Sequence, residues 1–214
     1  GVVIQQCVGL QYGNHFYPVI SGVAQSYNFY PLHPMEPEEG IIHLALGLGK
    51  IIMDGERIYR FSPKHPQMNL PYASTQEFIE NSQNKFYALN LKQETSVFQD
   101  DENSNLIKFD ISQAEQDGSL FFVGSTYSPQ DQTIQDTLSF EGPRLVTFAN
   151  ILKYKIFPLP EVINEILDIG VRALGTHVEI EFCLNLFRDP QKKPEMYILQ
   201  IRPMVAGGES LEVT

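Results

Sequence analysis

The sequence has little cysteine and no cluster of lysine or arginine among its 214 residues. Its two cysteines, Cys7 and Cys183, each lie in an apolar run typical of a buried, unpaired thiol, so we expect two reduced cysteines in a cytoplasmic protein. Acidic residues outnumber basic ones by 26 to 15, which leaves a net charge of −11. A chain with this charge and no basic patch is not expected to bind nucleic acid.

The sequence also lacks the apolar run of about 18 residues or more that a membrane-spanning helix needs, and it does not open with a basic stretch followed by an apolar one. We therefore expect neither a membrane span nor export. The five histidines are scattered, with no pair at metal-ligand spacing beside a cysteine or carboxylate cluster, so zinc is not indicated. Hydrophobic residues make up 43% of the chain, enough for a buried core in one large domain or two small ones.

Two strand-like segments near the C-terminus, residues 178–184 and 197–203, carry the most informative pattern. In each, the period of two that is typical of β-strands separates polar from apolar side chains. In the second segment this alternation places Tyr197, Leu199 and Ile201 on one face. If the two strands form a hairpin and their polar faces coincide, the shared face carries Glu179, Glu181, Gln200 and Arg202.

Such a face would suit a metal-bound phosphate. Carboxylate and amide oxygens are ligands for Mg²⁺, which usually takes one or two protein carboxylates and completes its shell with water and phosphate. A neighbouring arginine binds phosphate oxygens in a bidentate manner. The alternative is that Glu181 and Arg202 form an ordinary cross-strand ion pair on a solvated sheet face. Spacing alone leaves both interpretations open.

An acidic-x-Glu-aromatic strand followed by a Leu-Gln-x-Arg strand resembles the end of the ATP-binding domain in the pyruvate phosphate dikinase and phosphoenolpyruvate synthase family. A second set of segments occurs in the same order as in that family: Val2-Val3-Ile4-Gln5-Gln6-Cys7-Val8-Gly9, Ser21-Gly22-Val23-Ala24, and Leu46-Gly47-Leu48-Gly49 ahead of Asp54-Gly55. The resemblance covers residues 2–61 and 158–203, about half of the chain, and leaves the middle unmatched.

The resemblance implies an α+β fold, namely part of an ATP-grasp domain with a mainly antiparallel sheet, one long helix and a β-rich insertion. In that family ATP lies between two subdomains, and phosphoryl groups pass through a histidine on a separate swivelling domain to pyruvate. By position, Glu181 and Gln200 would be ligands to Mg²⁺ and to the ATP phosphates. Arg202 would be catalytic, stabilising charge on the transferring phosphate, and Glu179 would be an acidic partner in cofactor binding.

Several parts of that family have no counterpart in this sequence: an arginine-rich phosphate-gripping segment, a phosphocarrier histidine and a pyruvate-binding barrel. We therefore expect the C-terminal part of an ATP-grasp unit from a longer phosphotransferase, inactive alone, with the rest of the parent enzyme as its partner. The phosphoryl acceptor stays open, because relatives that act on a glucan or an antibiotic would share this nucleotide-binding half.

Two other functions stay open. The first is a degenerate ATP-grasp module that binds a nucleotide or a partner without catalysis. It is favoured by Lys50, which stands after Gly-Leu-Gly where the family usually has an acidic residue. The second is a structural, β-rich interaction domain, favoured by the acidic composition and by residues 85–151.

Four parts of the chain are predicted from these patterns: residues 1–74 as the first part of the ATP-grasp subdomain, 75–151 as the β-rich insertion, 152–204 as the final helix and hairpin, and 205–214 as a linker or tail. Within the insertion, alternating apolar residues between turn signals predict strands. The expected strands there are 86–91, 95–98, 106–111, 119–125, 137–140 and 144–148.

Outside the insertion, residues 2–9 and 16–24 are each expected to form one strand, because they are rich in β-branched and aromatic residues. A short helix is predicted over 75–81 with a serine or threonine cap. The strongest helix prediction is 158–173, which has an acidic first turn, a broad apolar stripe and a glycine, Gly175, at its end.

Two further features could bind phosphate, but each has a simpler explanation. The Gly47-Leu48-Gly49 turn could bring backbone N–H groups to a phosphate beside Lys50. It lacks P-loop spacing, however, and a tight structural turn explains it equally well. Arg57 and Arg60 could likewise reach a phosphate or could simply solvate a strand edge, which is the interpretation we favour.

Overall fold

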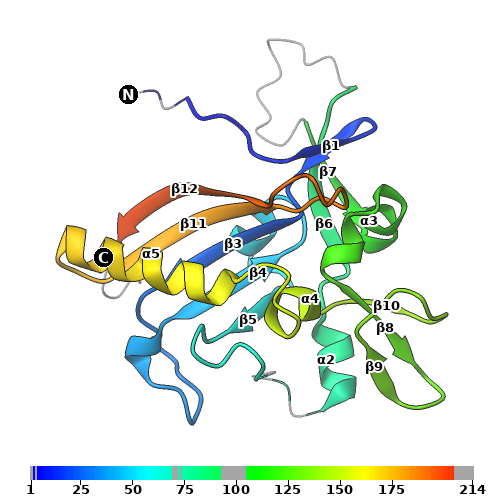
Figure 1. The fold of residues 1–214 in the computed structure, drawn as a ribbon, viewed down its shortest axis with the longest axis horizontal. Helices are drawn as coiled ribbons and strands as arrows, with labels where there is room; N and C mark the ends of the chain where they lie inside the picture. The colour runs from blue at the N-terminus through cyan, green and yellow to red at the C-terminus, as the bar shows by residue number, and fades with distance from the viewer. Residues whose placement is uncertain (1, 3, 69–71, 73, 93–104, 205–214) are drawn as a thin grey trace, which may run out of the picture.

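The computed structural model describes residues 2, 4–68, 72, 74–92 and 105–204. Its main sheet has five strands in the order β12-β11-β3-β4-β5, all antiparallel to their neighbours (Figure 1). The strands are β3 (Ile20–Gln25), β4 (Ile41–Ala45), β5 (Tyr59–Phe61), β11 (Val178–Asn185) and β12 (Glu195–Pro203). The main sheet thus joins an N-terminal block of the sequence to the C-terminal hairpin.

Strand register divides the main sheet into two faces. One row across the sheet contains Phe182, Gly22 and Leu44, and the next contains Glu181, Val23 and His43. Residues paired across antiparallel strands share a face, and successive rows alternate. We call the face with Phe182 the helix face and the face with Glu181 the polar face.

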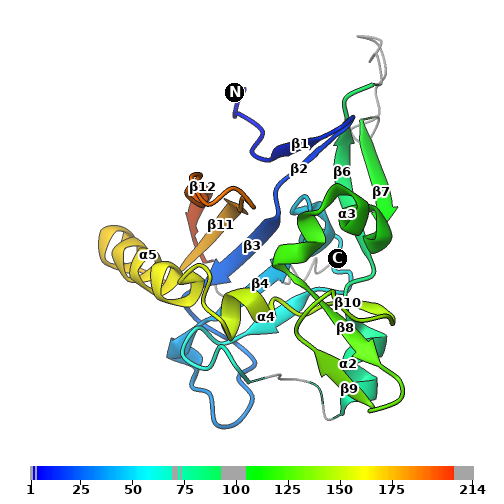
Figure 2. The ribbon, with the colours of Figure 1, turned by 45° about the vertical axis from the view of Figure 1, so that its right-hand side comes forward.

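Helix α5 (Leu159–Leu174) covers the helix face, where it runs along β11 and β3 (Figures 1 and 2). Gly170 lets the helix approach closely, since a Cβ there would lie 2.7 Å from Ile201 Cδ1 and 3.0 Å from Val178 Cγ2. Gly175 ends the helix with φ of 69°, a conformation that glycine adopts without strain. The helix predicted from the apolar stripe is confirmed to within one residue at each end.

Two smaller sheets lie beside the main one. The first has four strands, in the order β1 (Leu10–Tyr12), β2 (His15–Tyr17), β6 (Lys85–Asn90) and β7 (Leu106–Asp110). The second has three, in the order β10 (Arg144–Val146), β8 (Gly124–Ser128) and β9 (Thr133–Gln135). Because β6 pairs with β2, the segment that we predicted as an insertion shares a sheet with the N-terminal part of the chain.

The remaining helices are short. They are the α-helices α1 (Lys50–Met53), α2 (Thr75–Asn81), α3 (Ile111–Asp117) and α4 (Ala149–Leu152), and the 3-10 helices η1 (Pro37–Glu39) and η2 (Ser119–Phe122). The predicted helix over 75–81 is confirmed, and Ser74 caps it by accepting a hydrogen bond of 3.1 Å from the Glu77 N–H. With its helices and antiparallel sheets, the fold belongs to the α+β class.

The strand predictions near the N-terminus are partly wrong. The described residues of 2–9 form no strand, and Val2 and Ile4 are 90% and 94% exposed, because no neighbouring strand or core takes up their side chains. The predicted strand over 16–24 is two strands in two different sheets, β2 and β3. Pro18, which has no N–H for a ladder, stands between them. Cys7 is exposed, contrary to the expectation of two buried thiols, whereas Cys183 is buried.

The predicted β-rich segment contains more helix than expected. Residues 119–125 begin as η2 and only then enter β8, and α3 follows β7 directly because Asp110 caps it, accepting a hydrogen bond of 3.0 Å from Ser112 N–H. Residues 137–140 form no strand, and the strand of that region is β9. The strands predicted at 86–91, 106–111 and 144–148 are confirmed as β6, β7 and β10, and the one at 95–98 lies outside the described residues.

None of the helices that the structure describes has the length and apolar character needed to span a bilayer.

The close contact between Gly22 and Phe182 gives a stability prediction. A Cβ at Gly22 would lie 2.1 Å from Phe182 Cζ, and this ring is buried in the core. We expect Gly22→Ala to destabilise the protein by about 1–3 kcal/mol through overpacking. Urea unfolding followed by circular dichroism measures the difference.

The matched control is Gly49→Ala, because a Cβ there would make only ordinary contacts with the Ser21 side chain, at 3.6 and 3.9 Å, and the backbone has an α-helical φ of −61°. This variant should be neutral or slightly more stable than the wild type. Equal midpoints for the two variants would show that the Phe182 ring can move away at little cost.

Candidate functional site

The C-terminal hairpin predicted from the sequence is formed by β11 and β12. Its register places Glu181 opposite Gln200 and Glu179 opposite Arg202. Because paired residues share a face, all four side chains belong to the polar face of the main sheet. The polar faces of the two strands therefore coincide, which was the condition for the predicted cluster.

A β-bulge interrupts this hairpin directly beside the cluster. The register shifts between Glu181 and Phe182, so Phe182 pairs with Ile198 and Leu199 is the extra residue. Tyr197 is therefore paired with Cys183 on the polar face. The simple alternation that placed Tyr197 with Ile201 is wrong, because a bulge breaks the period of two.

The carboxylate of Glu179 is held from both neighbouring strands. Arg202 donates to its Oε1 through Nε at 2.8 Å and also through Nη2, and Gln25 on β3 donates to its Oε2 at 2.7 Å. The hydrogen bond and the charge of Glu179 raise the pKa of Arg202, with a smaller contribution from the charge of Glu181. The cross-strand ion pair considered from the sequence thus forms, but its acidic member is Glu179 instead of Glu181.

Glu181 and Gln200 differ from that pair in having no protein partner within the described part of the chain: no hydrogen bond or ion pair joins either side chain to another residue there. Nor do the described residues contain a group of three or more His, Cys, Asp or Glu side chains arranged to hold a metal ion. A cation bound here would have to rely on these two oxygen ligands and on oxygens from its own ligand. That ligand set fits Mg²⁺ with a nucleotide phosphate.

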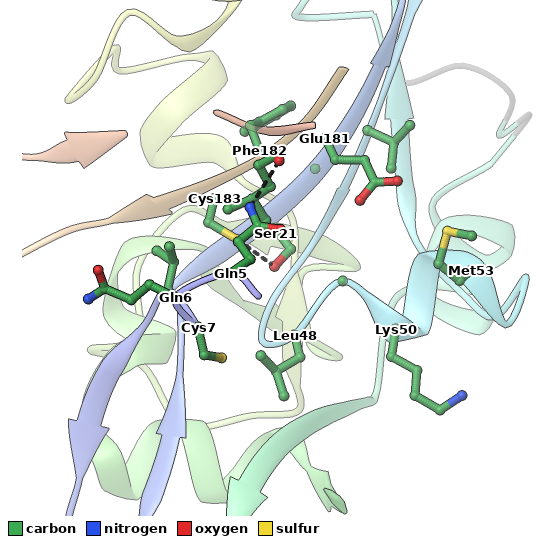
Figure 3. A pocket seen from close by; sticks show the side chains of 15 residues that line it. Gln5, Gln6, Cys7, Ser21, Leu48, Lys50, Met53, Glu181, Phe182 and Cys183 are labelled. Carbon is green, nitrogen blue, oxygen red and sulfur yellow. Dashed lines mark hydrogen bonds between the residues drawn. The ribbon is translucent and has the colours of Figure 1, made fainter. Parts of the chain in front are cut away.

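A pocket of about 420 Å³ opens beside Glu181 on the polar face. Figure 3 shows Glu181, Cys183 and Ser21 on neighbouring strands, Leu48 and Lys50 on the segment across from them, and Cys7 on the N-terminal segment. Burial raises the pKa of Cys183 to about 11, so its thiol is protonated at neutral pH. The pocket therefore has one carboxylate, one lysine and otherwise uncharged walls.

The glycine turn before α1 forms one wall of this pocket. Gly47 has φ of 85° and no room for a side chain, since a Cβ would lie 2.8 Å from Tyr87 O. Ser21 on β3 donates a hydrogen bond of 2.7 Å to Gly47 O and so fixes the turn against the main sheet. The turn therefore has a structural reason, and it also brings Gly49 and Lys50 to the pocket.

Lys50 is already engaged by an acidic neighbour. Its Nζ lies 3.0 Å from Asp54 Oδ1, one helical turn further on, and 5.7 Å from the centre of the Tyr87 ring. The pKa of Asp54 is lowered, mainly by the hydrogen bond that Lys50 donates to it. The positive charge that departs from the family pattern is therefore offset within α1 itself.

Sequence reasoning missed other residues of the polar face. Gln25 on β3 and His43 on β4 lie on it, and Arg60 on β5 is paired with His43. No alternation marked them, because the positions of β3 and β4 on this face also include Val23, Ile41 and Ala45. Without the strand order, nothing in the sequence showed that these residues share a face with Glu179 and Glu181.

A family model described as pyruvate phosphate dikinase, AMP/ATP-binding domain, matches residues 1–213. The match also runs through residues 62–157, where the sequence alone showed no resemblance. The comparison with curated proteins gave no match. Because the family model covers almost the whole sequence, the chain belongs to the family of pyruvate phosphate dikinase AMP/ATP-binding domains.

Proposed function

We propose that this chain is the Mg²⁺- and ATP-binding part of a phosphotransferase that resembles phosphoenolpyruvate synthase and pyruvate phosphate dikinase. The observation that carries the proposal is the paired register of Glu181 with Gln200 and of Glu179 with Arg202, in a chain of an AMP/ATP-binding family. Four side chains suited to a metal-bound polyphosphate thereby meet on one face of one sheet.

The roles follow from the contacts of each side chain. Glu181 and Gln200, whose oxygens have no protein partner in the described region, would hold Mg²⁺ and through it the ATP phosphates. Arg202 uses Nε and Nη2 for Glu179, and its side chain is 51% exposed, so the outer edge of the guanidinium can contact a phosphate. Glu179 contributes to cofactor binding by holding Arg202.

Phosphoryl transfer suits such a site because it needs positioning and charge neutralisation more than a covalent protein group. Bound Mg²⁺ would supply neutralisation of the phosphate oxygens. Arg202 would bind the transferring phosphate, and Glu179 and Gln25 would hold the guanidinium in place. Gln25 thereby joins the proposed site, although the sequence alone did not point to it.

We further propose that the fold is part of an ATP-grasp unit and that the remaining steps occur in other parts of a longer enzyme. Those parts would supply the other ATP-binding subdomain, the histidine that carries the phosphoryl group and the binding site for pyruvate. The two free thiols fit a reducing compartment, so we place the enzyme in the cytoplasm.

A second candidate function is nucleotide or partner binding without catalysis. It is favoured by Lys50 beside the pocket, where the family usually has an acidic residue. A lysine there attracts phosphate but cannot bind Mg²⁺, so it would favour binding of the nucleotide over metal-assisted transfer.

Substitution of Glu181 tests the metal site. We expect Glu181→Gln to remove most of the Mg²⁺-dependent gain in ATP affinity, about tenfold or more, because the amide that replaces the carboxylate carries no charge. ATP binding without Mg²⁺ should change little. Calorimetric titrations with ATP, in Mg²⁺ and in EDTA, measure both quantities.

The control for this experiment is Glu165→Gln, which removes an exposed carboxylate from α5 on the other side of the main sheet. It should leave both titrations unchanged. An identical response to Mg²⁺ in the wild type and in Glu181→Gln would exclude Glu181 as a metal ligand.

Substitution of Arg202 tests the phosphate contact. We expect Arg202→Met to weaken ATP binding about tenfold to a hundredfold and to leave AMP binding nearly unchanged, because a charge-assisted hydrogen bond contributes about 1.5–3 kcal/mol. Arg172→Met, in the last turn of α5, is the matched control. Equal losses for ATP and AMP would argue against a contact with the terminal phosphates.

In the complete parent enzyme the same substitution separates the two candidate functions. If Arg202 is catalytic, its replacement should lower the rate of the parent enzyme by several powers of ten. If the chain only binds a ligand, the replacement should lower affinity alone.

The isolated chain should form no phosphoenolpyruvate from ATP, Mg²⁺ and pyruvate, because the acceptor and carrier sites would lie elsewhere. A coupled assay or ³¹P NMR with the purified chain measures this directly. Turnover above the enzyme-free blank would show that the chain is catalytically complete.

A further inference from the structure

Arg60 lies on the polar face of the main sheet, where the proposed function does not use it. It is the middle residue of β5, between Tyr59 and Phe61, which are buried on the helix face. Its backbone partner is His43 on β4, so the two side chains share the polar face. Arg60 therefore projects from an edge strand toward the same surface that carries Glu181.

Arg60 forms no ion pair with any carboxylate that the structure describes. Among the residues that the structure describes, Arg144 and Arg202 take part in ion pairs but Arg60 does not. Arg57, Arg172 and Arg188 likewise form no ion pair among the described residues, and Arg60 differs from them in lying on the polar face, where it is paired with His43. Such a guanidinium presents a planar set of donors suited to a carboxylate or a phosphate.

His43 lies half-buried beside Arg60. Burial, with a smaller contribution from the charge of Arg60, lowers the pKa of His43 to about 4 against the opposing charge of Glu179. The imidazole is therefore neutral at neutral pH and has one N–H to donate. Within the described residues no hydrogen bond engages that N–H. His43 can thus donate to a ligand without adding a second positive charge.

The two side chains line one pocket of about 460 Å³. Its walls include Gln25, Asn28 and Ser62 as polar residues, and Phe29 and Tyr30 as aromatic ones. The aromatic side chains are 49% and 89% exposed, so the pocket is open to solvent on that side. A ligand that reached Arg60 here would be partly shielded from water, which strengthens an ionic contact.

The carboxylates near this pocket are already satisfied. Glu179 accepts hydrogen bonds from Arg202 and Gln25. Glu39 accepts one of 3.2 Å from Ser62 and lies 3.4 Å from His65 Nε2. Arg202 offsets the charge of Glu179, and the hydrogen bond from Ser62 holds the Glu39 carboxylate, whereas Arg60 takes part in no ion pair among the described residues.

We propose that Arg60 and His43 form a binding site for a phosphate-type oxyanion on the polar face, separate from the Glu181–Gln200 pair. The guanidinium would bind two oxygens and the imidazole N–H a third. Three strand-to-strand steps separate Glu181 from Arg60, about 14 Å between their Cα positions at ~4.8 Å a step. A single phosphate cannot be a ligand at both places, so this is a second subsite on the same face.

The test is a titration of the chain with inorganic phosphate at constant ionic strength, without Mg²⁺ or nucleotide. NMR signals of the His43 imidazole and the Arg60 guanidinium report on the site. We expect saturable shifts of both signals in the wild type and at least a tenfold loss of affinity in Arg60→Met. Arg60→Lys, which keeps the charge but not the fork of donors, should lose part of the affinity.

Arg57→Met is the matched control, because Arg57 is also exposed, lies three residues away and does not line this pocket. Its phosphate affinity should stay within twofold of the wild type. Shifts that do not saturate, no loss in Arg60→Met, or an equal loss in Arg57→Met would overturn the proposal. Urea unfolding of each variant shows that it is folded, and His43→Gln provides a second test of the same site.

Two further titrations, one with the Glu181→Gln variant and one with ATP and Mg²⁺, distinguish this site from the proposed nucleotide site and identify the source of the oxyanion. Glu181→Gln should leave phosphate binding unchanged, so the subsite can stand even if the metal site fails. If ATP with Mg²⁺ displaces phosphate from Arg60, the site takes a phosphate of the nucleotide. If both bind together, it takes free phosphate or another phosphate-bearing ligand. Either result supports the subsite, and a loss of binding in Glu181→Gln would contradict its independence.

Discussion

The backbone pairing between β11 and β12 is the interaction on which the candidate site depends. It places Glu181 against Gln200 and Glu179 against Arg202, and it does so next to a bulge at Leu199. A slip of one residue would turn Gln200 and Arg202 to the helix face, where α5 packs. The apolar residues of that face hold the register in place, since Ile180 and Phe182 are buried against the neighbouring strands and the helix. Packing on one side of the sheet thus aligns polar groups on the other.

Charge is divided unevenly along the polar face. Glu179 is neutralised by Arg202 and further held by Gln25, while Glu181, two residues further along β11, has no such partner in the described region. Three strands away from Glu181, on β5, Arg60 forms no ion pair among the described residues and lies beside a neutral histidine. Within the part of the chain that is described, the polar face therefore has an unpaired carboxylate on β11 and an arginine on β5, with the Glu179–Arg202 ion pair on the β11–β12 side. This arrangement suits a ligand that carries both a metal ion and phosphate groups.

Much of the fold followed from local patterns, and the failures have a common cause. The long helix before Gly175 and the capped helix after Ser74 were predictable because an apolar stripe, an N-terminal cap and a C-terminal glycine are all local sequence signals. The described residues of 2–9 do not form the expected strand, since a strand needs a ladder partner and these residues pair with no strand. Pro18 divides what looked like one strand, and η2 occupies part of another. In each case a favourable composition was overridden by the absence or position of a pairing partner.

For the site itself, the sequence by itself determined which residues alternate on each strand of the hairpin, and hence that Glu179, Glu181, Gln200 and Arg202 could meet. The sequence also showed the family resemblance, because the motifs and their order can be read without the structure. The tertiary structure alone decided that Arg202 pairs with Glu179, that the bulge turns Tyr197 to the polar face, and that Gln25, His43 and Arg60 join the same surface. The physical reason is that alternation is local, whereas strand order, register and charge pairing arise between separate strands: 23 residues separate Glu179 from Arg202, and 154 separate Gln25 from Glu179.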